Sequence, residues 1–186
     1  MPNQPLPIIE NIHTIVFDFD GVFTDNKVWV HQDGSESVRC DRSDGLGFDL
    51  IKNYQKKNSL QIDMFILSKE ANPVVLARAN KLKLDCYHGV LNKLEFIEHY
   101  LNNRFPENKS AFSGLVYLGN DLNDLSVMSR AGCSIAPSDA HFLIKNIASL
   151  VLNEKGGEGF IRSFIEKLLR IDNLTEEEIN ELVSNC

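Results

Sequence analysis

Short apolar runs alternate along the chain with longer amphipathic segments, and this alternation constrains the fold more than any other feature of the sequence. The clearest apolar runs lie at 14–17, 63–67 and 115–118, and helical periodicity follows each of them, after a short interruption in the first case. Strands that alternate with helices in this way form a mostly parallel sheet. The sequence therefore predicts an α/β fold, a Rossmann-like parallel sheet flanked by helices.

One segment interrupts the expected step from the first strand to the first helix. Two stretches rich in strand-forming residues flank the turn sequence around Gly34, which is typical of a β-hairpin. We expect this hairpin insertion at about residues 26–41, followed by a helix from about Asp44 to Lys57.

The chain of 186 residues shows no internal repeat and no interdomain linker. We therefore predict a single domain over residues 1–186, with a core of about 12–169. A short helical tail is expected at about 170–186.

The composition narrows the possible partners. Hydrophobic residues make up 43% of the chain, so it can build an ordinary core. The 19 basic and 26 acidic residues give a net charge of −7, which disfavours binding to nucleic acid or to an anionic membrane surface. A small anionic substrate stays compatible with this charge, because a cation within a site can reverse the local field.

The sequence predicts a protein of the cytoplasm. No apolar stretch approaches the roughly 20 residues that span a bilayer, and the N-terminus lacks the pattern of a signal peptide. The four cysteines, Cys40, Cys86, Cys133 and Cys186, lack the spacing of a zinc site or a disulfide framework, which favours free or buried thiols.

Polar side chains follow three of the predicted strands. They are Asp18 and Asp20 after the first strand, Ser68 after the second, and Asn120, Asp121 and Asp124 after the third. Ligands of parallel sheets bind at the carboxyl ends of the strands, so we expect these side chains to share one site. Their oxygens suit Mg²⁺, beside which one carboxylate can attack a phosphoryl group while another transfers a proton.

The segment 18–25, Asp-Phe-Asp-Gly-Val-Phe-Thr-Asp, resembles motif I of the haloacid dehalogenase (HAD) superfamily, in the form typical of its phosphatases. Ser68 lies where motif II of that superfamily has its serine or threonine, and Lys93 lies where motif III has its lysine. Residues 119–124 are similar to the acidic motif IV. The four motifs occur in the family's order over nearly the whole chain.

The resemblance implies a role for each matching residue. Asp18 would be the nucleophile that forms an aspartyl-phosphate and a ligand of Mg²⁺. Asp20 would be the general acid and base, with its backbone carbonyl on the metal. Thr24 and Ser68 would hydrogen-bond the phosphoryl oxygens, and Lys93 would neutralise their charge.

Motif IV departs from the family's commonest pattern, because Asn120 stands where many relatives have a metal-binding aspartate. Either the side-chain oxygen of Asn120 or the carboxylate of Asp121 would complete the metal site. Asp124 is expected to hold Lys93. Because asparagine carries no negative charge, a weakly active or inactive member of the family remains an alternative.

The chain has no room for a cap domain between its motifs, and this resembles the small capless phosphatases that act on 8- or 9-phosphates of 3-deoxy-2-ulosonic acids. These relatives form homotetramers through the hairpin. The stretch 66–75 is similar to the phosphatase-like domain associated with acylneuraminate cytidylyltransferases. The resemblance favours a nonulosonate 9-phosphate, a sialic-acid-like substrate, with Glu70 and Arg78 as contacts of the sugar acid.

Three other interpretations remain open at this point. The first is a phosphatase of 3-deoxy-D-manno-octulosonate 8-phosphate, an eight-carbon substrate. The second is a tetramerisation module without activity, although the related modules have an altered motif I whereas Asp18 and Asp20 are both present here. The third is a phosphoacceptor receiver domain, which the Asp-x-Asp pair and the hairpin disfavour.

Overall fold

The computed structural model describes residues 5–184 and shows a six-stranded parallel sheet in the order β5-β4-β1-β6-β7-β8. The strands of this sheet are β1 (Thr14–Phe17), β4 (Asp63–Leu67), β5 (Asp85–Tyr87), β6 (Leu115–Leu118), β7 (Cys133–Ala136) and β8 (Leu150–Val151). Every residue of β1, β6 and β7 is buried, as expected for strands covered on both faces. The predicted α/β fold is confirmed.

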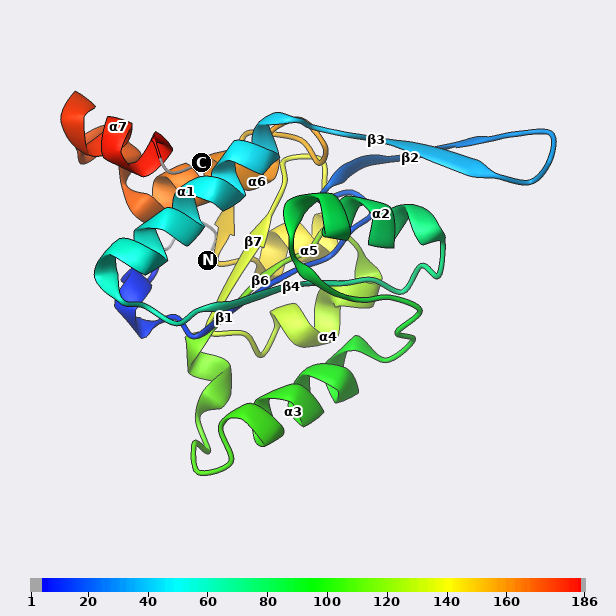
Figure 1. Ribbon diagram of the computed structural model, residues 1–186. Helices are drawn as coiled ribbons and strands as arrows, with labels where there is room; N and C mark the ends of the chain where they lie inside the picture. Colours follow the sequence, from blue (N-terminus) through cyan, green and yellow to red (C-terminus); the bar gives the residue numbers. More distant parts are fainter. Residues whose placement is uncertain (1–4, 185–186) are drawn as a thin grey trace.

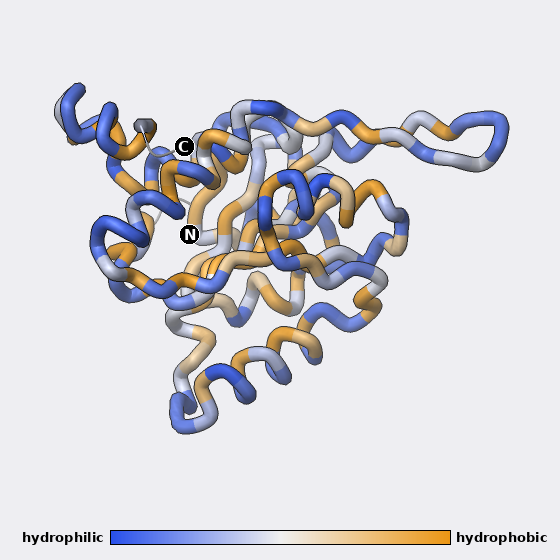
Figure 2. Tube along the Cα trace, in the orientation of Figure 1, coloured by the Kyte–Doolittle hydropathy of each residue, from blue (hydrophilic) through white to orange (hydrophobic). Residues whose placement is uncertain are grey.

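Helices cover both faces of this sheet (Figure 1). The α-helices are α1 (Ser43–Asn58), α2 (Pro73–Leu82), α3 (Lys93–Arg104), α4 (Leu125–Met128), α5 (Phe142–Ile147), α6 (Phe160–Leu169) and α7 (Glu176–Val183). Short 3₁₀ helices are η1 (Ile9–Asn11), η2 (Ala111–Gly114), η3 (Leu122–Asp124) and η4 (Ile171–Asn173). The larger apolar cluster joins the sheet to α1, α2 and α6, and the smaller one joins it to α3, α4 and α5. Figure 2 shows the apolar colour concentrated on the strands between these layers.

The predicted hairpin is present as a separate two-stranded antiparallel sheet of β2 (Thr24–Val30) and β3 (Glu36–Cys40). It projects from the body of the molecule (Figure 1). Three apolar side chains in β2, Val28, Trp29 and Val30, are 48%, 55% and 68% exposed. Between β4 and α3 the described chain contains only α2 and β5, so no cap domain is inserted there.

Cys40, Cys86 and Cys133 are free thiols, and Cys186 lies outside the described residues, as does the end of the predicted tail. Within residues 5–184 we find no helix that is both long and apolar enough to cross a membrane.

Asp44, in the first turn of α1, is a fully buried carboxyl that joins α1 to α6. Its Oδ1 accepts the backbone N–H of Arg162 at 3.1 Å, and its Oδ2 has no hydrogen-bond partner among the described residues. Burial raises the pKa of Asp44 from its ordinary 3.8 to about 7, although the bond from Arg162 opposes this shift. The folded chain therefore holds this proton more tightly than the unfolded chain does.

This raised pKa predicts a loss of stability as the pH increases. Between the two pKa values the folded state binds more protons than the unfolded state, so the free energy of unfolding falls from about pH 4 to about pH 7. Between pH 5 and pH 8 we expect the wild type to lose about 3 kcal/mol more than an Asp44→Asn variant. Urea unfolding of both proteins at the two pH values measures this difference, and equal losses would contradict it.

Candidate active site

The register of the central strands brings three motifs to one edge of the sheet. Phe17, the last residue of β1, pairs with Ile66 of β4 and with Leu118 of β6. The chain therefore leaves the three strands at the same level, and the next residues include Asp18, Ser68 and Asn120. This is the edge at which parallel sheets bind ligands.

The loop after β1 is held in place by its own apolar side chains. Phe19, Val22 and Phe23 are fully buried, and the backbone N–H groups of Val22 and Phe23 donate to the carbonyl of Phe19. Between them Gly21 has a φ of +77°, and a Cβ there would lie 1.9 Å from Nδ2 of Asn120. Glycine is required at this position because the side chain of Asn120 packs directly on the loop.

Lys93, the first residue of α3, lies between two carboxylates. Its Nζ is 2.6 Å from Oδ1 of Asp18 and 2.7 Å from Oδ1 of Asp124, and all three side chains are at most 5% exposed. Asp124 also accepts the hydroxyl of Tyr117 at 2.8 Å and the backbone N–H of Asn120 at 2.9 Å. Asp124 thus connects Lys93 to the loop of motif IV.

The buried site carries more negative than positive charge. Burial and the charge of Asp124 raise the pKa of Asp18 to about 8, and Lys93 only partly opposes them. Burial also raises the pKa of Asp20, with a further contribution from Glu70. Burial lowers the pKa of Lys93, but the carboxylates of Asp18 and Asp124 outweigh this effect and raise it. A further cation in the site would stabilise the ionised form of Asp18.

A cavity of about 80 Å³ lies at this edge of the sheet. Its lining residues are Asp18, Asp20, Asn26, Ser68, Lys69, Glu70, Asn120, Asp121 and Asn123. Oδ1 of Asn120 is buried and has no hydrogen-bond partner among the described residues. An unpartnered amide oxygen beside an ionisable carboxylate is the donor set that a hard divalent cation takes, so the residues present fit such an ion.

The coordination of a metal ion in this cavity would need other oxygen ligands besides carboxylates. In the described part of the chain, no group of three His, Cys, Asp or Glu side chains is arranged to hold a metal. The fit therefore rests on the carboxylate of Asp18 together with neutral oxygens such as that of Asn120. Asp121 lines the cavity too, but it is exposed, and its Oδ1 accepts the N–H of Leu122 at 2.7 Å.

Ser68 and Glu70 both line the cavity, as expected from the sequence. The Oγ of Ser68 accepts the backbone N–H of Glu70 at 3.0 Å, and its own hydroxyl proton stays available to a ligand. Oε1 of Glu70 accepts the N–H groups of Ala71 and Asn72 at 2.8 and 3.1 Å. Glu70 therefore also stabilises the turn that leads into α2.

Thr24 occupies a different position from the one expected. Its side chain is fully buried and is absent from the lining of the cavity. Its Oγ1 instead accepts the backbone N–H groups of Gly21 and Asn26, both at 3.2 Å. The hydroxyl therefore fixes the shape of the loop that carries Asp18 and Asp20.

Arg78 is likewise not brought to the cavity that contains Glu70. It lies on α2 and lines a separate cavity of about 610 Å³, together with Arg42 and Lys81. Its Nη2 donates to the backbone carbonyl of Asp41 at 2.6 Å, because α2 packs beside the end of β3. Within this single chain, Arg78 joins the base of the hairpin to α2.

Three polar residues line the cavity that sequence reasoning did not select: Asn26, Lys69 and Asn123. Each follows a motif residue by a few positions, so a search of the segments beside the motifs would have included them. Asn26 carries a further signal, since asparagine is enriched at positions with positive φ and this residue has a φ of 60°.

Comparisons with known proteins agree with this fold. No family model matches the chain. The chain is 30% identical over 171 residues to 3-deoxy-D-manno-octulosonate 8-phosphate phosphatase KdsC of Salmonella typhi, covering 90% of this chain and 85% of that protein.

Solved structures agree as well. A chain from Streptomyces avermitilis described as a HAD family hydrolase is 37% identical with a TM-score of 0.79, and the match covers 92% of this chain and 94% of that one. 3-Deoxy-D-manno-octulosonate 8-phosphate phosphatase of Yersinia pestis is 28% identical with a TM-score of 0.75, covering 87% and 83%.

The fold, the ordered motifs and these similarities define the chain as a phosphatase of the HAD superfamily, a phosphoric monoester hydrolase. Within that superfamily it belongs to the subfamily of the 3-deoxy-D-manno-octulosonate 8-phosphate phosphatases.

Proposed function

We propose that this chain is a Mg²⁺-dependent phosphatase that removes the terminal phosphate of a 3-deoxy-2-ulosonic acid. The observation that carries the proposal is an arrangement in which Asp18 and Asn120 line one small cavity and Asp18 is paired with the buried Lys93. It combines a carboxylate that can act as nucleophile, a buried ammonium and an unpartnered oxygen in reach of a cation.

The proposed reaction uses the residues of this site in two steps. A carboxylate oxygen of Asp18 attacks the phosphorus atom, and the bond from phosphorus to the sugar oxygen breaks as Asp20 donates a proton to that oxygen. Water then attacks the phosphorus atom of the aspartyl-phosphate and gives its proton to Asp20, which releases inorganic phosphate and restores Asp18. Lys93 and Ser68 stabilise the charge on the phosphoryl oxygens.

A divalent metal is supported by the site and by one relative. Asp18, the backbone carbonyl of Asp20 and the amide oxygen of Asn120 would hold it, with Asp121 as the alternative to Asn120. When bound, Mg²⁺ neutralises the charge between nucleophile and phosphate. A structure of the phosphatase from Haemophilus influenzae, 27% identical with a TM-score of 0.74, was solved in a cobalt-bound form.

For the substrate we favour a nonulosonate 9-phosphate, the sialic-acid-like class. The similarity of residues 66–75 to the phosphatase-like domain of acylneuraminate cytidylyltransferases supports this preference. The alternative is 3-deoxy-D-manno-octulosonate 8-phosphate, on which the curated relatives act according to their names.

We also propose that the chain forms a homotetramer through the hairpin. The exposed apolar side chains of Val28, Trp29 and Val30 support this proposal. A monomeric mass by light scattering would disprove it.

Phosphate release from a panel of sugar phosphates tests the proposed function. The panel contains octulosonate 8-phosphate, N-acetylneuraminate 9-phosphate and ketodeoxynonulosonate 9-phosphate. We expect Mg²⁺-dependent turnover that EDTA abolishes and excess Mg²⁺ restores, fastest with a nonulosonate. Fastest turnover of the octulosonate ester selects the alternative substrate. If the folded protein releases no phosphate with Mg²⁺ present, the phosphatase proposal fails and an oligomerisation module is favoured.

A further inference from the structure

Asn26 stands at the mouth of the cavity, where β2 leaves the loop of motif I. Its side chain is exposed and lines the cavity next to the catalytic loop. Its φ of 60° lies in the left-handed region, which costs most residues about 1 kcal/mol and which asparagine tolerates better than others. The backbone conformation alone is compatible with asparagine or glycine, so it does not say what the amide side chain does at the mouth of the cavity.

The backbone of Asn26 is anchored from within the loop. Its N–H donates to Oγ1 of Thr24, which also accepts the N–H of Gly21. Thr24 is fully buried, so this anchor is fixed by the surrounding core. The position of Asn26 is therefore tied to the same hydroxyl that shapes the loop of Asp18 and Asp20.

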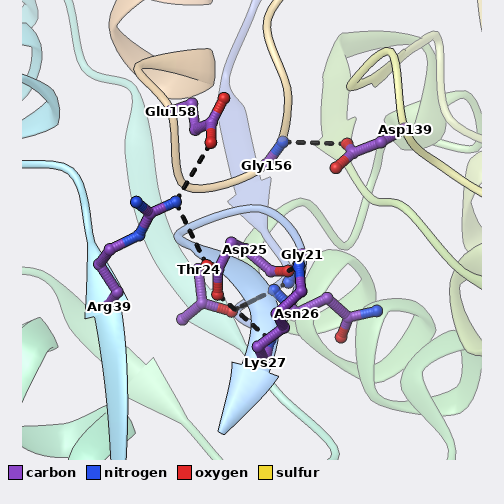
Figure 3. Close-up of polar contacts among 9 residues, drawn as sticks. All are labelled: Gly21, Thr24, Asp25, Asn26, Lys27, Arg39, Asp139, Gly156 and Glu158. Carbon is purple, nitrogen blue, oxygen red and sulfur yellow. Dashed lines mark hydrogen bonds and ion pairs between the residues drawn. The ribbon is translucent and has the colours of Figure 1, made fainter.

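A second set of contacts holds the loop from the other side (Figure 3). Gly156 packs so closely that a Cβ there would lie 2.0 Å from the carbonyl oxygen of Gly21. Arg39 of β3 reaches Asp25 at 3.2 Å and Glu158 at 3.1 Å, and so links the hairpin, the loop and the segment before α6. Asn26 is thus presented by a backbone that is held on both sides before any ligand binds.

The cavity is large enough for only one end of a substrate molecule. A volume of about 80 Å³ corresponds to only a few water molecules, which is enough for a phosphoryl group but not for an eight- or nine-carbon sugar acid. The leaving group must therefore lie at the mouth, among the exposed side chains. Glu70 and Asp121 carry negative charge there and already accept backbone N–H groups.

The amides of Asn26 and Asn123 differ from these carboxylates, and Asn26 is the one whose backbone is tied to the loop of Asp18 and Asp20. No side-chain hydrogen bond of Asn26 is found within residues 5–184, and the amide both donates and accepts. A neutral group with both capacities matches the hydroxyl groups beside the ester oxygen of a polyhydroxylated substrate. We propose that Asn26 is a specificity-determining residue whose side-chain amide hydrogen-bonds a hydroxyl of the leaving group. The inference rests on the proposed phosphatase function.

Asn26→Gly tests the inference, because glycine keeps the left-handed backbone and removes only the amide. We measure KM and kcat with the sugar-acid phosphate that the wild type hydrolyses best, and Ki for inorganic phosphate as a probe of the inner cavity. We expect KM to rise about three- to tenfold, the range for one neutral hydrogen bond, with kcat and Ki unchanged. Ser59→Gly, at another left-handed residue after α1, is the matched control and should change none of the three.

The outcomes separate the inference from the function on which it rests. An active wild type with unchanged KM in Asn26→Gly refutes the role of the amide and leaves the phosphatase proposal standing. Equal changes in KM and in Ki for inorganic phosphate would show that Asn26 only shapes the loop, which also overturns the inference. A wild type that hydrolyses no ester in the panel overturns both.

Discussion

Asp18→Asn is expected to lower kcat by at least about 10⁴-fold while the protein stays folded, since loss of a nucleophile removes the covalent step entirely. Among the cavity residues, only Asp18 is a carboxylate in contact with Lys93. Asparagine has the same shape and removes a charge that burial and Asp124 both disfavour, so the midpoint of thermal unfolding should change little. Phosphate release and a thermal melt of the same preparation measure the two effects.

The control for this variant is the same substitution far from the site. Asp172, in η4 and exposed, can be changed to asparagine without touching the cavity. We expect full activity from Asp172→Asn. If Asp18→Asn kept more than about a tenth of the wild-type rate, no aspartyl-phosphate could form at Asp18 and the proposed mechanism would be wrong.

Lys93→Met should both abolish activity and destabilise the fold. Removing the ammonium leaves the buried Asp124 without its counter-charge and raises the pKa of Asp18 further, and breaking a buried ion pair in this way typically costs about 3–5 kcal/mol. We also expect a loss of at least about 10³-fold in kcat, because the variant lacks the charge that we propose to stabilise the phosphoryl oxygens. Urea unfolding at neutral pH and phosphate release measure the two losses.

Two further variants separate charge from packing at Lys93. Lys93→Met combined with Asp124→Asn should recover part of the stability but none of the activity, because it removes one unpaired carboxylate without replacing the ammonium. Lys167→Met, on the exposed face of α6, is the matched control and should change stability by less than about 0.5 kcal/mol. A Lys93→Met protein as stable as the wild type would mean that the carboxylates are protonated or solvated.

The sequence allowed the sheet and the meeting of its motifs to be predicted because both follow from local patterns. Apolar runs of four or five residues mark β1, β4 and β6, and the strands' parallel direction then brings Asp18, Ser68 and Asn120 together. The helix predicted from Asp44 to about Lys57 is observed as Ser43–Asn58. These features depend on period and order, which a sequence shows directly.

The roles of Thr24 and Arg78 could not be predicted in the same way. The direction of the Thr24 hydroxyl depends on how the loop turns at Gly21, and the contact of Arg78 depends on where the end of β3 meets α2. The first depends on the local path of the backbone and the second on a contact between distant segments, and residue spacing shows neither. Asn26 was missed for a related reason, since it lies where the pairing register of β2 with β3 shifts, which the residue pattern does not show.

The place of β1 in the middle of the sheet has a consequence for synthesis on the ribosome. Thr14 pairs with both Asp63 and Leu115. The strand β1 is synthesised first, and its second neighbouring strand is synthesised only about a hundred residues later. At the usual speed of translation this is a delay of about 5–20 s, during which an apolar strand has unpaired edges and is exposed to aggregation. Asp18, the proposed nucleophile, is thus among the earliest side chains to be made and among the last to reach its final surroundings.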